Sequence, residues 1–151
     1  MGTYIPERYQ AAVKFIKAYE PQYRINSSIY IPFTSYIKEK LKLTNLDHSI
    51  ITFDHMPRNI YLSQLASTKV MIDVSNKNQT GLAMRVIEAL SMGKKVLTSN
   101  HYITCEAFYN PNNICIYDPN NPIIPKSFID QPFDGVAHTL SLWEWLEAIF
   151  R

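Results

Sequence analysis

A glycine, an arginine and a glutamate are spaced so that they share one face of a predicted helix. In the stretch NQTGLAMRVIEALSMGKKV these residues are Gly81, Arg85 and Glu88, and apolar residues occupy the opposite face. The N–H groups at the start of such a helix, around 81–83, can bind a phosphate, helped by the helix dipole. Glu88 would repel a phosphate, but its two acceptor oxygens suit the hydroxyl pair of a ribose beyond it.

The same residues also allow a purely structural interpretation. Arg85 and Glu88 can form an exposed i,i+3 ion pair, which contributes only about 0.2–0.5 kcal/mol to helix stability. The surrounding sequence favours the ligand-binding interpretation, because a strand-like run and a polar loop precede Gly81. Glycine has no side chain, so the backbone there can come close to a ligand.

Strands and helices are predicted to alternate along the chain. The predicted helices include 6–19, a segment after Pro32, a segment from about residue 57, and the helix after Gly81. The predicted strands cover residues 28–31, 49–53, 70–74, 95–99 and 114–117. These strands are nearly all apolar, as parallel strands covered on both faces are. We therefore expect an α/β fold with a doubly wound parallel sheet in three α/β/α layers, forming one Rossmann-like domain over residues 1–151.

Several local expectations accompany this fold. The helix after Pro32 should be capped by Thr34 and carry Ile37 and Leu41 inward. The chain is expected to begin with a helix, which suggests that a first strand lies outside it. The Pro- and Asn-rich segment 119–139 should be irregular, and residues 141–151 should form a C-terminal helix that begins with a capping box.

Composition argues against several classes of protein. The 15 basic and 13 acidic residues give a net charge of +2 without the basic clustering of a nucleic-acid-binding protein. No apolar run approaches the ~20 residues of a transmembrane helix, and the N-terminus lacks the apolar segment of a signal peptide. Cys105 and Cys115 have no metal-type spacing, so we expect reduced, mostly buried thiols in a cytoplasmic protein. The four histidines also lack metal-ligand spacing, and we expect neither a metal nor a cofactor.

Ligands of parallel α/β sheets bind at the carboxyl ends of the strands. The loops to consider are therefore Asp54-His55-Met56, the segment 75–81, and Asn100-His101. Either histidine could serve as a general base, although a loop histidine is more often simply solvated. Asp73 falls near the end of a predicted strand, where a capping or turn role is expected.

The stretch around Glu88 resembles the signature of the C-terminal domain of GT-B fold glycosyltransferases of the group 1 type, E-x-F-G-x-x-x-x-E-A-x-A-x-G-x-P-V. The matching residues are Gly81, Glu88, Ala89, Gly93 and Val96. With the flanking strand–loop–helix segments, the resemblance covers roughly residues 50–120. The version NQTGL-x-MR-x-IEAL looks like that of bacterial enzymes that build lipopolysaccharide or capsule.

The resemblance implies that a nucleotide-diphosphate sugar is the donor substrate. Glu88 would bind the ribose hydroxyls, the amides of Gly81, Leu82 and Ala83 would face the diphosphate, and the loop 54–56 would touch the base. The sugar would be transferred to a bacterial surface polysaccharide or lipopolysaccharide core. The acceptor would bind an N-terminal domain outside this chain, so the isolated domain should bind nucleotide and turn over poorly. The expected location is the cytoplasm, including the inner face of the cytoplasmic membrane.

This sequence departs from the family pattern at one glutamate. The position eight residues before Glu88, where the family contacts the donor sugar, is Thr80, with Gln79 beside it. Arg85 is the candidate cation for the diphosphate, because the family's own cationic residues have no clear match. No residue is assigned as catalytic.

Three other functions are compatible with an α/β fold of this size. A dinucleotide-binding domain would need G-x-G-x-x-G, which is missing from this sequence with its 4 glycines. A phospho-receiver domain would need an acidic cluster, for which only Asp73 is arguable. A non-catalytic nucleotide- or nucleotide-sugar-binding module with a degenerate active site remains the alternative.

Overall fold

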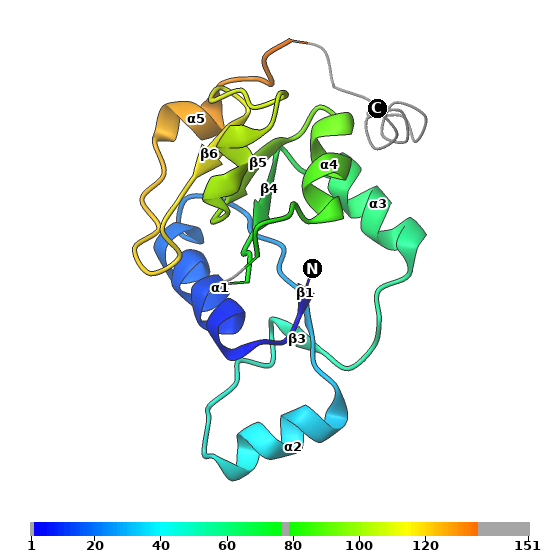
Figure 1. Cartoon of the computed structure of the whole chain (residues 1–151). Helices are drawn as coiled ribbons and strands as arrows, with labels where there is room; N and C mark the ends of the chain where they lie inside the picture. The colour runs from blue at the N-terminus through cyan, green and yellow to red at the C-terminus, as the bar shows by residue number, and fades with distance from the viewer. Residues whose placement is uncertain (1, 77–78, 136–151) are drawn as a thin grey trace. The chain divides into compact units, whose positions relative to one another are not determined.

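The computed structural model describes residues 2–76 and 79–135 (Figure 1). The chain forms two compact units. The first unit comprises Met1–Ser63 and the second Gln64–Arg151. The predicted helix at 141–151, which contains Trp143 and Trp145, lies outside the described residues.

The first unit contains a parallel sheet with the order β1-β2-β3. Its elements are β1 (Gly2–Thr3), α1 (Pro6–Tyr19), β2 (Ile29–Tyr30), α2 (Phe33–Leu41) and β3 (Ile51–Thr52), and α3 (Arg58–Ser67) spans the division between the units. The helix α1 has the predicted bounds. It begins with proline at its first position and carries Glu7 in the first turn and Lys17 in the last, which suits the helix dipole. The expectation that the chain begins with a helix is wrong, because β1 precedes α1 and pairs with β2.

The second unit contains a parallel sheet with the order β4-β5-β6. Its elements are β4 (Val70–Asp73), α4 (Met84–Ser91), β5 (Lys95–Thr98), the 3-10 helix η1 (His101–Cys105), β6 (Ile114–Ile116) and α5 (Lys126–Asp130). The central strand β5 is buried at all four residues, as a strand covered on both faces should be. The helix α4 packs against β4 and β5.

Parallel strands that alternate with helices confirm the predicted α/β class. Each unit builds a three-stranded parallel sheet from consecutive strands, as each half of a Rossmann-like α/β/α fold does. How the two units assemble into one domain over residues 1–151 stays a prediction. The segment 119–139, expected to be irregular, contains the short helix α5, whose Phe128 is buried. None of the helices in the described part of the chain combines the length and apolar character that a membrane crossing requires.

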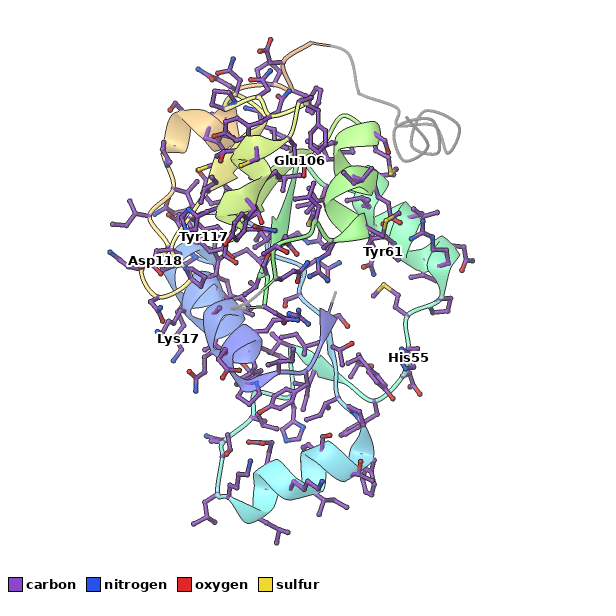
Figure 2. The ribbon with its side chains drawn as sticks, viewed as in Figure 1. Lys17, His55, Tyr61, Glu106, Tyr117 and Asp118 are labelled. Carbon is purple, nitrogen blue, oxygen red and sulfur yellow. The ribbon has the colours of Figure 1, made fainter. Side chains whose placement is uncertain are left out.

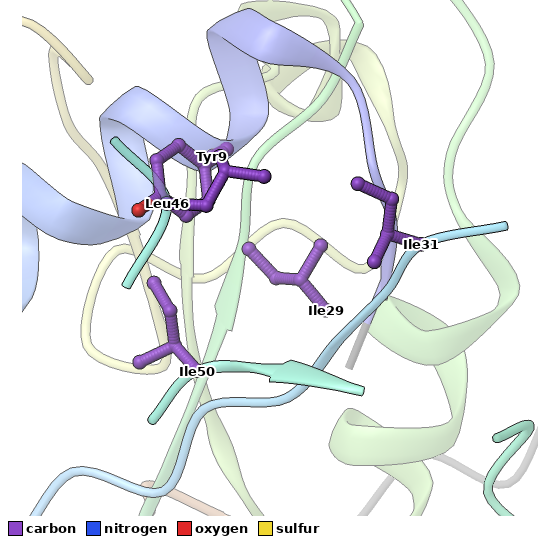
Figure 3. Close-up of a cluster of buried hydrophobic side chains, with 5 residues drawn as sticks. All are labelled: Tyr9, Ile29, Ile31, Leu46 and Ile50. Atoms are coloured by element: carbon purple, nitrogen blue, oxygen red, sulfur yellow. The ribbon is translucent and has the colours of Figure 1, made fainter. Parts of the chain in front are cut away.

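The core of the first unit lies between α1 and its sheet (Figure 3). Its buried members are Tyr9, Ile29, Ile31, Leu46 and Ile50. Ile29 and Ile31 point to the same face because side chains alternate along an extended chain. The Tyr9 hydroxyl accepts a hydrogen bond from the N–H of Asp47 at 2.6 Å, so the one polar atom of this cluster has a partner.

The helix α2 is turned opposite to the prediction. Ile37 and Leu41 are exposed, while Glu39 is buried. The helix starts after Pro32, and Thr34 is not its cap. The Glu39 carboxylate accepts hydrogen bonds from Lys42 Nζ at 3.0 Å and Thr44 Oγ1 at 3.2 Å. A buried carboxylate needs such donors, because they compensate for its removal from water.

These hydrogen bonds have a consequence for the pH dependence of stability. The bond from Lys42 is the largest of the effects that hold the pKa of Glu39 below its ordinary value of 4.5. A carboxyl group whose pKa is lower in the folded state stabilises the fold above its unfolded pKa, and this contribution is lost as the pH falls through the folded pKa.

We expect Glu39→Gln to lower the thermal unfolding midpoint at neutral pH. The difference from the wild type should shrink as the pH falls below 4.5, where the wild-type carboxyl becomes protonated. Thermal melts followed by circular dichroism at a series of pH values would measure it, with the exposed Glu20→Gln as the matched control. A difference that stays constant with pH would contradict this account of Glu39.

Candidate functional site

The predicted site residues fall into two groups, one in each unit. Asp54, His55 and Met56 follow β3 in the first unit. The second unit holds the larger group, which consists of Gln79, Thr80, Gly81, Leu82, Ala83, Arg85 and Glu88.

A buried carboxylate lies at the centre of the second group. Asp73 is the last residue of β4 and is only 1% exposed. It accepts hydrogen bonds from Arg85 Nε at 2.6 Å, from Ser75 Oγ at 2.8 Å and from Thr98 Oγ1 at 3.0 Å. Three donors around one carboxylate compensate for its removal from water. The expected capping or turn role of Asp73 is therefore too modest, because this residue joins β4, β5 and α4.

The ion pair between Asp73 and Arg85 is asymmetric in exposure. The Asp73 side chain is 1% exposed and that of Arg85 is 22% exposed. The positive partner is therefore the one nearer to solvent, at the start of α4. The purely structural interpretation paired Arg85 with Glu88 on an exposed helix face. It did not predict that Arg85 also pairs with the buried Asp73. The Glu88 side chain is half-buried and not fully exposed to solvent.

Asn100 connects the loop after β4 to the loop after β5. It is buried, and its backbone N–H donates to Thr98 Oγ1 at 3.1 Å. Its side chain accepts from the N–H of Tyr102 at 3.0 Å and donates through Nδ2 to the Gly81 carbonyl at 3.1 Å. The Gln79 side chain donates to the same carbonyl at 2.9 Å. The Gly81 peptide is thus held in place by two side-chain amides.

The helix that should present its N-terminus to a phosphate begins later than predicted. It starts at Met84, and Ala83 is its N-cap residue with extended backbone angles. Gly81, Leu82 and Ala83 form the approach to the helix rather than its first turn. The positive end of the helix dipole therefore lies at Met84 and Arg85. The predicted role of the 81–83 amides in binding an anion stays a prediction.

The two glycines of this stretch have different structural explanations. Gly93 adopts a left-handed conformation with φ of 65° just after α4. Its N–H bonds to Leu90 O and that of Lys94 to Ala89 O, which is the Schellman ending of a helix. A Cβ atom on Gly81, in contrast, would meet no described atom within 4 Å. Packing against the described residues therefore does not require glycine at position 81, and space beside it is open.

The third strand of this sheet contributes a tyrosine to the same region. Tyr117 follows β6 and is buried (Figure 2). Burial, and to a lesser degree the negative charge of Asp73, raises the pKa of Tyr117. The hydroxyl stays protonated at neutral pH and adds a polar group to the carboxyl edge of the sheet.

In the first unit, His55 stacks on an aromatic ring. It lies on the loop between β3 and α3 (Figure 2), with its ring 3.7 Å from that of Tyr30 and nearly parallel to it. Asp54 is exposed, and its N–H bonds to Thr52 Oγ1 at 3.2 Å. Met56 is half-buried. His101, the other candidate base, is exposed in η1.

The cysteines differ from the expectation in part. Cys105 is exposed rather than buried, whereas Cys115 is half-buried and burial raises its thiol pKa. Within residues 2–76 and 79–135, no three His, Cys, Asp or Glu side chains gather in a way that could hold a metal ion.

The sequence did not predict that Asp73, Thr98, Asn100 and Tyr117 come together, with a side-chain hydrogen bond from Thr98 to Asp73 and backbone N–H groups of Asn100 and Tyr117 bonded to Thr98. Their common signal is position, since each is the last residue of a strand or follows it within two residues. Chemically, the Asp73–Arg85 pair holds a guanidinium at the start of α4, four residues after Gly81, where a Cβ atom would meet no described atom within 4 Å. Asp73 is surrounded by donors, which suits an anchor for Arg85 better than a proton acceptor.

Comparisons with models of protein families, with curated proteins and with solved structures found no match for this chain.

We expect Arg85→Met to cost about 3 kcal/mol of unfolding free energy, because the Asp73 carboxylate is left buried without its counter-ion. Asp73→Asn should cost less, because the Arg85 side chain that remains is 22% exposed. Asp73→Asn and Arg85→Met each test this by urea denaturation. The double variant should cost clearly less than the sum of the two single variants, since the second change removes the stranded charge.

The exposed Asp130→Asn is the matched control for the charge change, and it should leave stability within about 0.5 kcal/mol of the wild type. Strictly additive effects of Asp73→Asn and Arg85→Met would show that the two side chains do not interact energetically.

Proposed function

We propose that the second unit binds a nucleotide-diphosphate sugar as the donor domain of a glycosyltransferase. The full-length enzyme would transfer the sugar to a bacterial surface polysaccharide or to a lipopolysaccharide core. The observation that carries the proposal is the Asp73–Arg85 pair, which holds a guanidinium at the start of α4, close in sequence to the open backbone of Gly81.

The charge arrangement supports binding of an anion on the outer side of this pair. The pair is neutral as a whole, but its carboxylate is buried and its guanidinium is the more exposed member. An anion outside the pair is therefore closer to the positive group. The positive end of the α4 dipole adds to the same field.

The spacing along α4 supports a ribose beyond the phosphate. Glu88 lies four residues after Met84, which corresponds to ~6 Å along a helix axis. A carboxylate at that position is far enough from the first turn to avoid the phosphate and can accept both hydroxyls of a ribose. Gly81 and Glu88 match the glycosyltransferase signature, and this match supports the assignment of Glu88 to the ribose.

Gln79 and Thr80 lie where the related family contacts the donor sugar, and their hydrogen bonds and exposure indicate different roles. The Gln79 amide is used to hold the Gly81 carbonyl, so it acts by shaping the loop. Thr80 is exposed, and its hydroxyl is the group available to contact the sugar. In the transfer reaction, Arg85 and the amides at the start of α4 would stabilise the negative charge that develops on the leaving nucleotide diphosphate.

Thr80 also favours a second candidate function. Its hydroxyl supplies no negative charge where the related family has a carboxylate, and a domain that binds the nucleotide without catalysis would tolerate this change. Such a non-catalytic module would still bind the nucleotide through Glu88 and Arg85.

We expect Glu88→Ala to weaken binding of UDP or GDP by roughly 10- to 100-fold, the effect of losing hydrogen bonds to a charged acceptor. Isothermal titration of the wild type with both nucleotides identifies the preferred one, and the variant is then titrated with it. The fold should be unchanged, because the buried face of α4 is formed by Val86, Ala89 and Leu90.

Glu106→Ala, which removes an exposed carboxylate next to η1, is the control and should bind as the wild type does. Equal affinities of the wild type and Glu88→Ala would return Glu88 to a structural role. A folded wild type that binds neither nucleotide would contradict the proposal itself.

A further inference from the structure

The helix α2 and the turn that follows it expose four large apolar side chains. Phe33 is 65% exposed, Ile37 43%, Leu41 79% and Leu43 92%. Phe33, Ile37 and Leu41 are spaced four residues apart, so they form one stripe along the helix. We call these four residues the α2 stripe.

The stripe is not the core-facing side of this helix. The opposite side carries the buried Glu39, which is hydrogen-bonded to Lys42 and Thr44. The Phe33 ring contacts that of Phe53 edge-on at 6.1 Å, and Phe53 is also exposed, so it extends the apolar surface beyond the helix. An apolar surface of this kind on the outside of a unit indicates an interaction site.

Leu43 occupies a position that does not favour leucine. It has a φ of 58° and ends α2 with the bonds Leu43 N–H to Lys40 O and Thr44 N–H to Glu39 O. Glycine is the usual residue at such a helix end, because a side chain is strained there. Neither this conformation nor packing explains the leucine, whose side chain is presented to solvent.

Positive charges border the stripe. Lys38 and Lys40 lie on the helix that carries the stripe, whereas the Lys42 ammonium is paired with the inward-facing Glu39, the one acidic residue between positions 33 and 46. The Lys40 ammonium lies 5.6 Å from the centre of the Tyr36 ring, beside the apolar residues. The outer face of this segment thus combines large apolar side chains with lysines and presents no exposed carboxylate.

We propose that the α2 stripe docks on an anionic lipid bilayer. The apolar side chains would enter the boundary between headgroups and acyl chains, and the lysines would contact anionic headgroups, as in interfacial amphipathic helices. A second copy of the chain fits less well, because a symmetric contact would place lysines opposite lysines. This inference concerns the first unit and does not depend on the proposed nucleotide site.

The test is co-sedimentation of the whole chain with vesicles of phosphatidylcholine alone or mixed with phosphatidylglycerol. The wild type should bind the mixed vesicles, bind the neutral ones weakly, and dissociate as salt is raised. The double variant Phe33→Ser/Leu41→Ser should lower the partition coefficient at least tenfold. Lys38→Gln/Lys40→Gln should lower it roughly 25-fold, at about fivefold for each lysine.

Two variants in the second unit serve as matched controls. Ile123→Ser removes an exposed apolar side chain, and Lys126→Gln removes an exposed lysine. Both should bind as the wild type does, and circular dichroism should show that every variant is folded. Sedimentation velocity of the wild type and of Leu41→Ser without lipid would measure whether the chain self-associates.

Three outcomes would overturn the proposal. Equal binding of the wild type and the α2 variants would place the lipid contact elsewhere. Self-association that Leu41→Ser abolishes would assign the stripe to a second copy. No binding of the wild type to anionic vesicles would leave an acidic protein surface as the partner.

Discussion

The arrangement of the second unit depends on a carboxylate that is removed from water. Asp73 lies at the end of β4, and an unpaired charge there would cost several kcal/mol. Its donors come from the loop after β4, from β5 and from α4. Because each donor belongs to a different element, satisfying one charge also fixes the order of these elements at the carboxyl edge of the sheet. The loops that carry the candidate site therefore begin from fixed points.

The elements that bury an apolar face could be predicted from the sequence with good accuracy. The bounds of α1 follow from its proline start and apolar spacing, and strands β2 to β6 fall within their predicted ranges, whereas β1, with only two residues, was not predicted. The network around Asp73 could not be predicted in the same way. Asp73 and Arg85 are 12 residues apart, and Thr98 reaches the carboxylate only because the parallel register places it beside Asp73. Pairings of this kind depend on register, which periodicity does not encode.

The reversed orientation of α2 shows a second limit of sequence patterns. A helical wheel separates Ile37 and Leu41 from Glu39, but it does not tell which face the rest of the unit will cover. The prediction assumed that the apolar face turns inward. The hydrogen bond between the Tyr4 hydroxyl and Glu39 favours the opposite choice, because it joins this face of α2 to the segment after β1. Tyr4 is affected in turn, since burial, with the charge of Glu39 as the next cause, raises its pKa to about 12.

The Gly81 carbonyl accepts hydrogen bonds from both Gln79 and Asn100. One bond is local, and the other reaches across to the end of β5. The backbone at Gly81 therefore loses its conformational entropy when the unit folds, rather than when a molecule binds beside it. A ligand at this position would meet a preorganised surface, and its affinity would not be reduced by the ordering of this peptide.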